Sequence, residues 1–183
     1  MKRMILFSVL ALAAAGPAQA MPWTVDAAKS VLGFQGSQGG SPFTGHFGKW
    51  TADIDFDPAH PESGHALVVI DMASARTGDP QKDQSLPQSD WFDVKGFPQA
   101  TFQATSFRAK GGKAFEAVGS LAIRGIKKDV VLPFQFDEAG GTAHVTGRLP
   151  LIRTDYGVGQ GDWKDGSLVA LDVAVTLDIQ AAH

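Results

Sequence analysis

A glycine-rich run, Asp155–Trp163 with the sequence DYGVGQGDW, has the composition of a loop that could cradle a phosphate. A dinucleotide-binding loop needs the spacing G-x-G-x-x-G and a helix that opens directly after it, so that the helix N-terminus meets the pyrophosphate. Here the third glycine, Gly161, comes one position early, Asp162 would repel a phosphate, and a strand pattern follows instead of a helix. The run therefore predicts a wide loop in which glycine permits unusual backbone angles and Trp163 packs over an apolar end.

The other residues that could do chemistry form no catalytic or metal-binding motif. His60 and His65 are separated by a proline and a glycine, among others, which is the pattern of a turn and not of a ligand pair on a helix or strand. The chain has no cysteine, which excludes thiolate ligands and thiol catalysis, and no G-x-S-x-G sequence marks a nucleophile elbow. We therefore predict no catalytic residue, no metal site and no resident cofactor, and interpret the aspartates as turn caps and solvated carboxylates.

Four charged residues are candidates for a polar end of the fold. Arg153 and Asp155 stand two positions apart at a predicted strand end, so they share a face if the strand continues. Arg76 and Asp83 flank a polar insertion in the middle of the chain. One interpretation is that the four form a rim at the mouth of the fold, and the other is that they make ion pairs that only fix loops.

The first twenty residues have the layout of a cleaved secretory signal. Lys2 and Arg3 precede an apolar run from Met4 to Ala15, and the run leads to an A-x-A sequence that ends at Ala20. The apolar run is short for a bilayer-spanning helix. We expect residues 1–20 to be a signal peptide and the protein to be exported, with an uncleaved membrane anchor as the alternative.

The remaining chain, residues 21–183, has the length of one domain that buries its own core. It would hold 183 − 20 = 163 residues, which is enough for a core without disulfide bonds. Removing Lys2 and Arg3 leaves 14 basic and 19 acidic residues, a formal charge of −5. A mildly acidic surface argues against a nucleic acid as partner.

Alternation with a period of two dominates this part of the chain. The clearest case is Leu168–Ile179, in which Leu171, Val173, Val175, Leu177 and Ile179 share one face. Similar runs lie at 52–56, 66–72, 102–107, 115–123, 130–136 and 142–151. Turn signals separate them, and two glycine pairs, Gly111-Gly112 and Gly140-Gly141, are typical of hairpins.

Eight or nine short strands in this arrangement predict an all-β fold, either an up-and-down antiparallel barrel or a sandwich. Residues 74–98 break the alternation with polar residues and three prolines, so we expect an insertion with one or two helical turns between Asp79 and Asp93. Twelve phenylalanines and four tryptophans would either pack an ordinary core or line an apolar cavity. The composition leaves both open.

Six segments together resemble a known family. They are WTVDAAKSVLGF, FTGHFGKWTADIDFDP, VVIDMASARTGD, SDWFDVKGFPQATFQATSF, GSLAIRGIKKDVVLPFQF and LIRTDYGVGQGDW. In this order they are similar to the YceI-like family of lipid- or polyisoprenoid-binding periplasmic domains, from Trp23 to about Ala181. The resemblance implies an eight-stranded antiparallel, lipocalin-like barrel with a short helical insertion, a periplasmic location, and a long apolar isoprenoid or related amphiphile inside it, without catalysis.

The resemblance also points to partners and to a departure. The GVGQGDW loop is similar to the form in family members associated with membrane cytochromes of the b type. Many members have Arg-Asp-x-His-Leu in the insertion, where this chain has Lys82-Asp83-Gln84-Ser85-Leu86. Lysine keeps the charge of arginine but loses its bidentate fork, which leaves the contact to the lipid headgroup open.

We therefore predict a binding or carrier protein for an isoprenoid, a quinone-like molecule or another amphiphilic lipid. The residues expected to line its cavity are Phe34, Phe43, Phe47, Trp50, Phe92, Phe97, Phe102, Leu121, Ile123, Phe134 and Trp163, each of which could equally fill a packed barrel. Two alternatives stay open. One is an accessory protein for quinone redox chemistry or stress that acts with a membrane cytochrome, and the other is a ligand-free barrel that binds protein partners, a second copy of the chain included.

Overall fold

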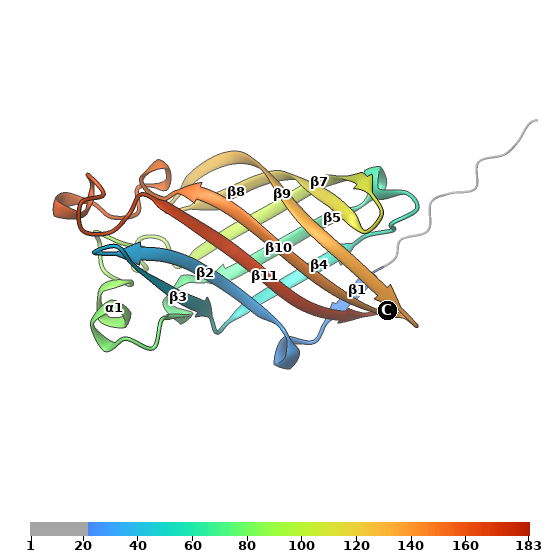
Figure 1. Ribbon diagram of the computed structural model, residues 1–183, viewed down its shortest axis with the longest axis horizontal. Coiled ribbons are helices and arrows are strands. Elements are labelled where there is room, and N and C mark those ends of the chain that lie inside the picture. Colours follow the sequence, from blue (N-terminus) through green and yellow to red (C-terminus); the bar gives the residue numbers. More distant parts are fainter. Residues whose placement is uncertain (1–21) are drawn as a thin grey trace, which may run out of the picture.

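The computed structural model describes residues 22–183, and these form a closed antiparallel β-barrel (Figure 1). The predicted signal peptide, residues 1–20, lies outside the described residues. The strands that close the ring are, in spatial order, β1 (Pro22–Val25), β4 (Trp50–Asp55), β5 (His65–Asp71), β7 (Gln99–Gly111), β8 (Ala114–Ile123), β9 (Ile126–Ala139), β10 (Thr142–Ile152) and β11 (Asp172–Ala182). Strand β11 pairs back onto β1, so the predicted eight-stranded barrel is confirmed and the sandwich alternative is wrong.

Three more strands extend the wall at one end of the ring. Strand β11 pairs with β1 through its last residues and with β2 (Val31–Gln38) through Ala174–Asp178. The turn between β1 and β2 is a short 3-10 helix, η1 (Ala27–Lys29), which Asp26 caps by accepting a hydrogen bond from the Ala28 amide. Strand β2 continues into β3 (Ser41–Phe47), and β3 pairs with β6 (Ala75–Arg76). This extension forms part of the end that we call the mouth, at the left of Figure 1.

A two-residue glycine turn fixes the register of the hairpin formed by β9 and β10. Strands β9 and β10 meet at the pair Ala139↔Thr142, and the two residues between them, Gly140 and Gly141, have φ values of 59° and 77°. Two consecutive positive φ angles are what a two-residue hairpin needs to follow the twist of its strands, and glycine adopts them without strain. The predicted hairpin at Gly140-Gly141 is thus confirmed.

The inward faces of the strands are the alternating apolar residues that the sequence predicted. On β11, Val173, Val175, Leu177 and Ile179 line the interior, and on β9 the residues Leu132, Phe134 and Phe136 are buried. At the end opposite the mouth, six aromatic rings are buried in one core cluster. We call this group the aromatic floor: Trp23, Phe56, Phe107, Phe115, Phe134 and Phe136.

The rings of the floor pack edge to face. Phe56 is central, with centroid distances of 4.8 Å to Phe107, 5.2 Å to Phe115 and 4.9 Å to Phe136. Such geometry adds about 0.5–1.5 kcal/mol per pair beyond the burial of area. The Trp23 indole also donates a hydrogen bond of 2.8 Å to the Phe56 carbonyl, so its polar atom is satisfied inside this cluster.

The predicted insertion covers the mouth. It contains one helix, α1 (Pro80–Ser85), which begins where Asp79 accepts hydrogen bonds from the amides of Gln81 and Lys82 and where proline occupies the first turn. Leu86 follows the helix and is buried, which anchors the segment to the barrel. The insertion differs from the prediction in one respect, because strand β6 lies inside it and pairs with β3.

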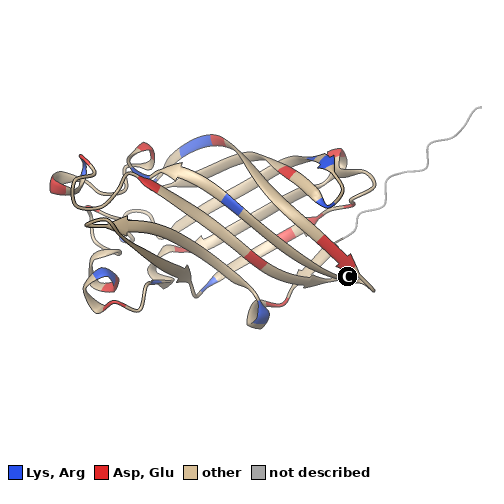
Figure 2. Ribbon diagram, viewed as in Figure 1, with Lys and Arg blue, Asp and Glu red and all other residues tan. Residues whose placement is uncertain are grey.

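No helix in the part of the chain that the structure describes is long and apolar enough to cross a bilayer. Lysine, arginine, aspartate and glutamate are scattered over the loops and along several strands (Figure 2). The residues of the described strands that line the cavity are uncharged. The single exception on the inner wall is Arg153.

Candidate ligand-binding cavity

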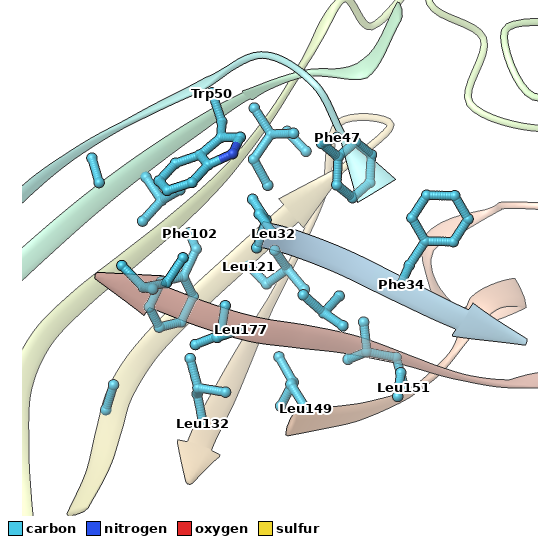
Figure 3. Close-up of a pocket in the computed structure, with 18 of the residues that line it drawn as sticks. Leu32, Phe34, Phe47, Trp50, Phe102, Leu121, Leu132, Leu149, Leu151 and Leu177 are labelled. Carbon is cyan, nitrogen blue, oxygen red and sulfur yellow. The ribbon is translucent and has the colours of Figure 1, made fainter. Parts of the chain in front are cut away.

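A cavity of about 240 Å³ lies inside the barrel between the mouth and the aromatic floor. Side chains from β2, β7, β8 and β11, among them Leu32, Phe102, Leu121 and Leu177, point toward a common centre (Figure 3). The side chains drawn there consist of carbon, apart from the indole nitrogen of Trp50. The wall therefore offers dispersion contacts and exclusion of water, and almost no hydrogen bonds.

Most of the predicted lining residues lie on this wall. They are Phe34, Phe43, Phe47, Trp50, Phe92, Phe102, Leu121, Ile123 and Phe134. Several of them, such as Phe34, Trp50 and Phe102, point inward and are nevertheless only half-buried. Interiors of folded proteins are close-packed, so inward side chains that keep accessible surface indicate space that the protein itself does not fill.

Two predicted lining residues, Phe97 and Trp163, lie elsewhere. Phe97 packs beside Gly125, with the Arg124 guanidinium over its ring at 5.9 Å. Trp163 lies against Trp91 at a centroid distance of 5.3 Å, behind the cavity wall. Phe97 is in a loop and Trp163 ends the 3-10 helix η5 (Gly161–Trp163). The period of two that orients strand side chains does not apply to either residue, so their direction could not be inferred from position.

The sequence reasoning also missed residues that line the cavity. These are aliphatic and come from β2, β9, β10 and β11: Leu32, Leu132, Leu149, Leu151, Val175 and Leu177. The prediction weighted aromatic residues, although the alternation on β11 had already identified Val175 and Leu177 as inward. Extending the same parity rule to β2, β9 and β10 would have found the others.

Three phenylalanines narrow the cavity near the mouth. Phe34 on β2, Phe47 on β3 and Phe92 of the insertion lie within centroid distances of 5.2, 6.5 and 6.2 Å of one another. Beside them the Lys82 ammonium lies 5.8 Å from the centre of the Phe43 ring. Rings from three separate elements, one of them the insertion, thus form the constriction at this end.

Arg153 is the most unusual group on the wall, because it is buried and has no carboxylate in contact. Each of its five N–H groups donates to a backbone carbonyl. The acceptors are Ala170 at 3.0 Å, Val158 at 2.9 Å, Gly159 at 3.4 Å, Val169 at 2.7 Å and, in addition, Trp163. Burial lowers the pKa of this guanidinium, and the charge of Asp165 opposes the shift.

The glycine-rich run is shaped around this side chain. Gly159 has a φ of 83°, and a Cβ atom placed there would lie 1.8 Å from Arg153 Nη1. The amides of Gly159 and Gln160 donate to the Asp90 carbonyl at 2.7 and 2.8 Å, which ties the loop to the insertion. The Arg153 guanidinium also lies over the Trp91 ring at 5.4 Å. The run is therefore a loop that encloses a buried cation, and not a phosphate cradle.

The four residues predicted for a polar rim do not meet. Strand β10 ends before Arg153, which opens the 3-10 helix η4 (Arg153–Tyr156) and turns inward. Asp155 is exposed and pairs with Lys128 at 3.0 Å. Arg76 donates to the carbonyls of Ala73 and Ala75. The contacts of Arg76, Arg153 and Asp155 therefore agree with the alternative interpretation, in which these residues hold loops in place.

Asp83 likewise has a local role. Its carboxylate accepts hydrogen bonds from the amide and the hydroxyl of Thr77 at 2.6 and 2.7 Å, and these bonds hold the pKa of Asp83 below its ordinary value. The bonds connect α1 to the segment that follows β6. Within residues 22–183 no group of three or more histidines and carboxylates is placed to hold a metal ion.

The sequence matches the YceI-like domain family over residues 23–181. BcnA from Burkholderia cenocepacia, a solved structure, is 36% identical, with a TM-score of 0.84 over 87% of this chain and 100% of that one. A UPF0312 protein of Pseudomonas savastanoi pv. phaseolicola is 29% identical over 173 residues, 90% of each chain.

A more distant structure shares the fold. It is described as a polyisoprenoid binding domain from Saccharophagus degradans, is 16% identical, and has a TM-score of 0.66 over 87% of this chain and 97% of that one. The family match begins at Trp23 in the floor of the barrel and ends at Ala181, the β11 residue that pairs with β1. It therefore covers the whole closed ring, and this chain belongs to the YceI-like domain family.

Proposed function

We propose that this protein is a binding or carrier protein that holds a long-chain isoprenoid, a quinone-like molecule or another amphiphilic lipid inside its barrel. The observation that carries the proposal is the apolar cavity, which is closed at one end by the aromatic floor and constricted at the other by phenylalanines. Apolar surface gains about 25 cal/mol per Å² when it leaves water, so a flexible hydrocarbon chain is the ligand that such a wall favours.

The chemistry of the wall also supports a role without catalysis. The cavity residues include no serine, histidine, aspartate or glutamate within the described chain, so no general base or nucleophile of these types faces a bound molecule. The polar side chains there are Arg153, Tyr156 and the indoles. The name of the Saccharophagus degradans domain, a polyisoprenoid binder with the same fold, points to the same class of ligand.

The proposal places the protein in the periplasm, because a signal peptide is predicted at residues 1–20. There a soluble barrel would exchange its lipid with a membrane. The resemblance of the GVGQGDW loop to that of members associated with b-type cytochromes makes such a cytochrome the membrane partner that we propose.

The first experiment is native mass spectrometry of the exported protein, purified without detergent, followed by solvent extraction of whatever it carries. We expect a discrete added mass that is released as a polyprenyl or other amphiphilic compound. Phe102→Asp places a charge on the cavity wall and should abolish this retention, since an unpaired buried carboxylate makes the wall unfit for hydrocarbon.

Leu67→Asp is the matched control, because Leu67 lies on the neighbouring strand β5 and is exposed. It should retain the ligand as the wild type does. A wild-type protein that carries nothing and takes up neither added geranylgeraniol nor ubiquinone would contradict the proposed function. Equal retention by both folded variants would contradict the assignment of Phe102 to the binding wall.

A further inference from the structure

The only tyrosine of the chain, Tyr156, carries a hydroxyl for which the fold provides no partner. Tyr156 ends η4, lies on the cavity wall and is 2% exposed. No group in residues 22–183 makes a hydrogen bond with its hydroxyl. A tyrosine hydroxyl usually finds a partner when it is buried, so this arrangement calls for a reason.

Tyr156 is one of the residues that line the cavity. Its neighbours in the core cluster are apolar, with Leu149 and Val158 among them. The Lys128 ammonium lies 5.9 Å from the ring centre and is already paired with Asp155 at 3.0 Å. No polar side-chain atom in the described chain is both fully buried and unpaired, so the small accessible surface of Tyr156 includes its hydroxyl.

The protonation state of the phenol decides what it can bind. Burial raises the pKa of Tyr156, and the negative charge of Asp155 raises it further. The group therefore stays protonated at neutral pH and is available as a hydrogen-bond donor.

We propose that the Tyr156 hydroxyl donates a hydrogen bond to a neutral oxygen atom of the lipid, such as the carbonyl of an ester, a ketone or a quinone. This deepens the proposed function and rests on it, since it names the chemical class of the polar end of the ligand. A binding site that is mostly apolar with a few placed polar groups uses those groups to fix the orientation of its ligand.

The other polar groups of the wall argue for a neutral oxygen over a phosphate. Arg153 is the sole cation on the described cavity wall, and all five of its N–H groups are bound to backbone carbonyls. A diphosphate that entered this cavity would meet no free cationic donor, and an unpaired buried anion is strongly unfavourable. A carbonyl needs one donor, which is what Tyr156 supplies.

The test compares three probes that share one chain: geranylgeranyl acetate, the corresponding hydrocarbon without oxygen, and geranylgeranyl diphosphate. Affinities are measured by quenching of tryptophan fluorescence for the wild type and for Tyr156→Phe, which removes the hydroxyl and keeps the ring. We expect the variant to bind the acetate about tenfold more weakly and the hydrocarbon as well as the wild type does. In the wild type the diphosphate should be the weakest of the three.

A second readout uses the fact that the chain has a single tyrosine. Protein labelled with carbon-13 at the tyrosine Cζ gives one signal, which should shift with the acetate and stay in place with the hydrocarbon. An unchanged preference for the acetate in Tyr156→Phe, or a wild type that prefers the diphosphate, overturns the inference while leaving a lipid carrier intact. A wild type that binds none of the three probes overturns the proposed function itself.

Discussion

Replacement of Arg153 by lysine tests whether one buried side chain holds the loops at the mouth. Arg153 donates to five carbonyls that belong to residues 158–170. Lysine keeps the positive charge but has three donors on a single nitrogen and no planar fork. The variant therefore separates the geometry of the guanidinium from its charge.

The expected magnitude follows from the count of acceptors. Three donors cannot satisfy five carbonyls, so at least two lose their bond, and each unsatisfied buried group costs about 1–3 kcal/mol. Because water can reach part of a loop, we expect the free energy of unfolding to fall by about 3 kcal/mol. For a domain of this size that corresponds to a fall in Tm of roughly 6–12 °C.

Chemical and thermal unfolding followed by circular dichroism measure this change. Arg148→Lys is the matched control, since Arg148 is an exposed arginine on the preceding strand β10 and bonds to Gln35. It should change stability by less than about 0.5 kcal/mol. The near-ultraviolet circular dichroism spectrum should also change only in Arg153→Lys. The ring centroids of Trp91 and Trp163 lie 5.3 Å apart, and the dichroism of this pair of rings depends on the position of the loop that Arg153 holds. A stability of Arg153→Lys equal to that of the control would refute the reasoning.

Two further predictions concern a glycine and a histidine. Gly159→Ala places a Cβ atom 1.8 Å from Arg153 Nη1 at a φ of 83°, so it should destabilise the fold by about 3 kcal/mol. In a double-mutant cycle, the variant that also carries Arg153→Lys should be only slightly less stable than either single variant. Full additivity of the two losses in stability would contradict the shared mechanism. The Asp57 carboxylate accepts a hydrogen bond from His60 Nδ1, which raises the pKa of His60. This pair therefore stabilises the fold below the unfolded pKa of about 6.5 and loses its effect as the pH rises through the folded pKa. Asp57→Asn should lower the pKa of His60 in an NMR titration, and an unchanged value would exclude the carboxylate as the cause.

The sequence predicted those parts of the fold in which a local rule determines the structure. Alternation placed Val175 and Leu177 on the inner face of β11, and the pair Gly140-Gly141 marked a hairpin through its need for positive φ angles. Closure of the ring could not be derived in this way. It depends on β11 pairing with both β1 and β2, a long-range choice that leaves no periodic signal in either strand.

The side chains at the mouth were predicted less well, for a related reason. Arg153 was placed on a strand face with Asp155, but the strand ends and the chain turns, so the two side chains point to different surroundings. Phe97 lies in a loop and Trp163 in the short 3-10 helix η5, so neither follows the alternation of a strand. No sequence pattern identified Tyr156 as a residue of the cavity. Its significance lies in a hydroxyl without a hydrogen-bond partner in the described chain, which only the packed structure reveals.

The two ends of the barrel explain how a stable fold can keep an unfilled interior. The aromatic floor packs six large rings against one another around Phe56, and the closed hydrogen-bonded ring of strands surrounds this core. Toward the mouth, inward residues such as Trp50 and Phe102 remain half-buried. Because the aromatic floor lies at the far end and Tyr156 is on η4, beside the loops of the mouth, the proposed lipid would enter with its hydrocarbon end first, and its polar end would stop near η4.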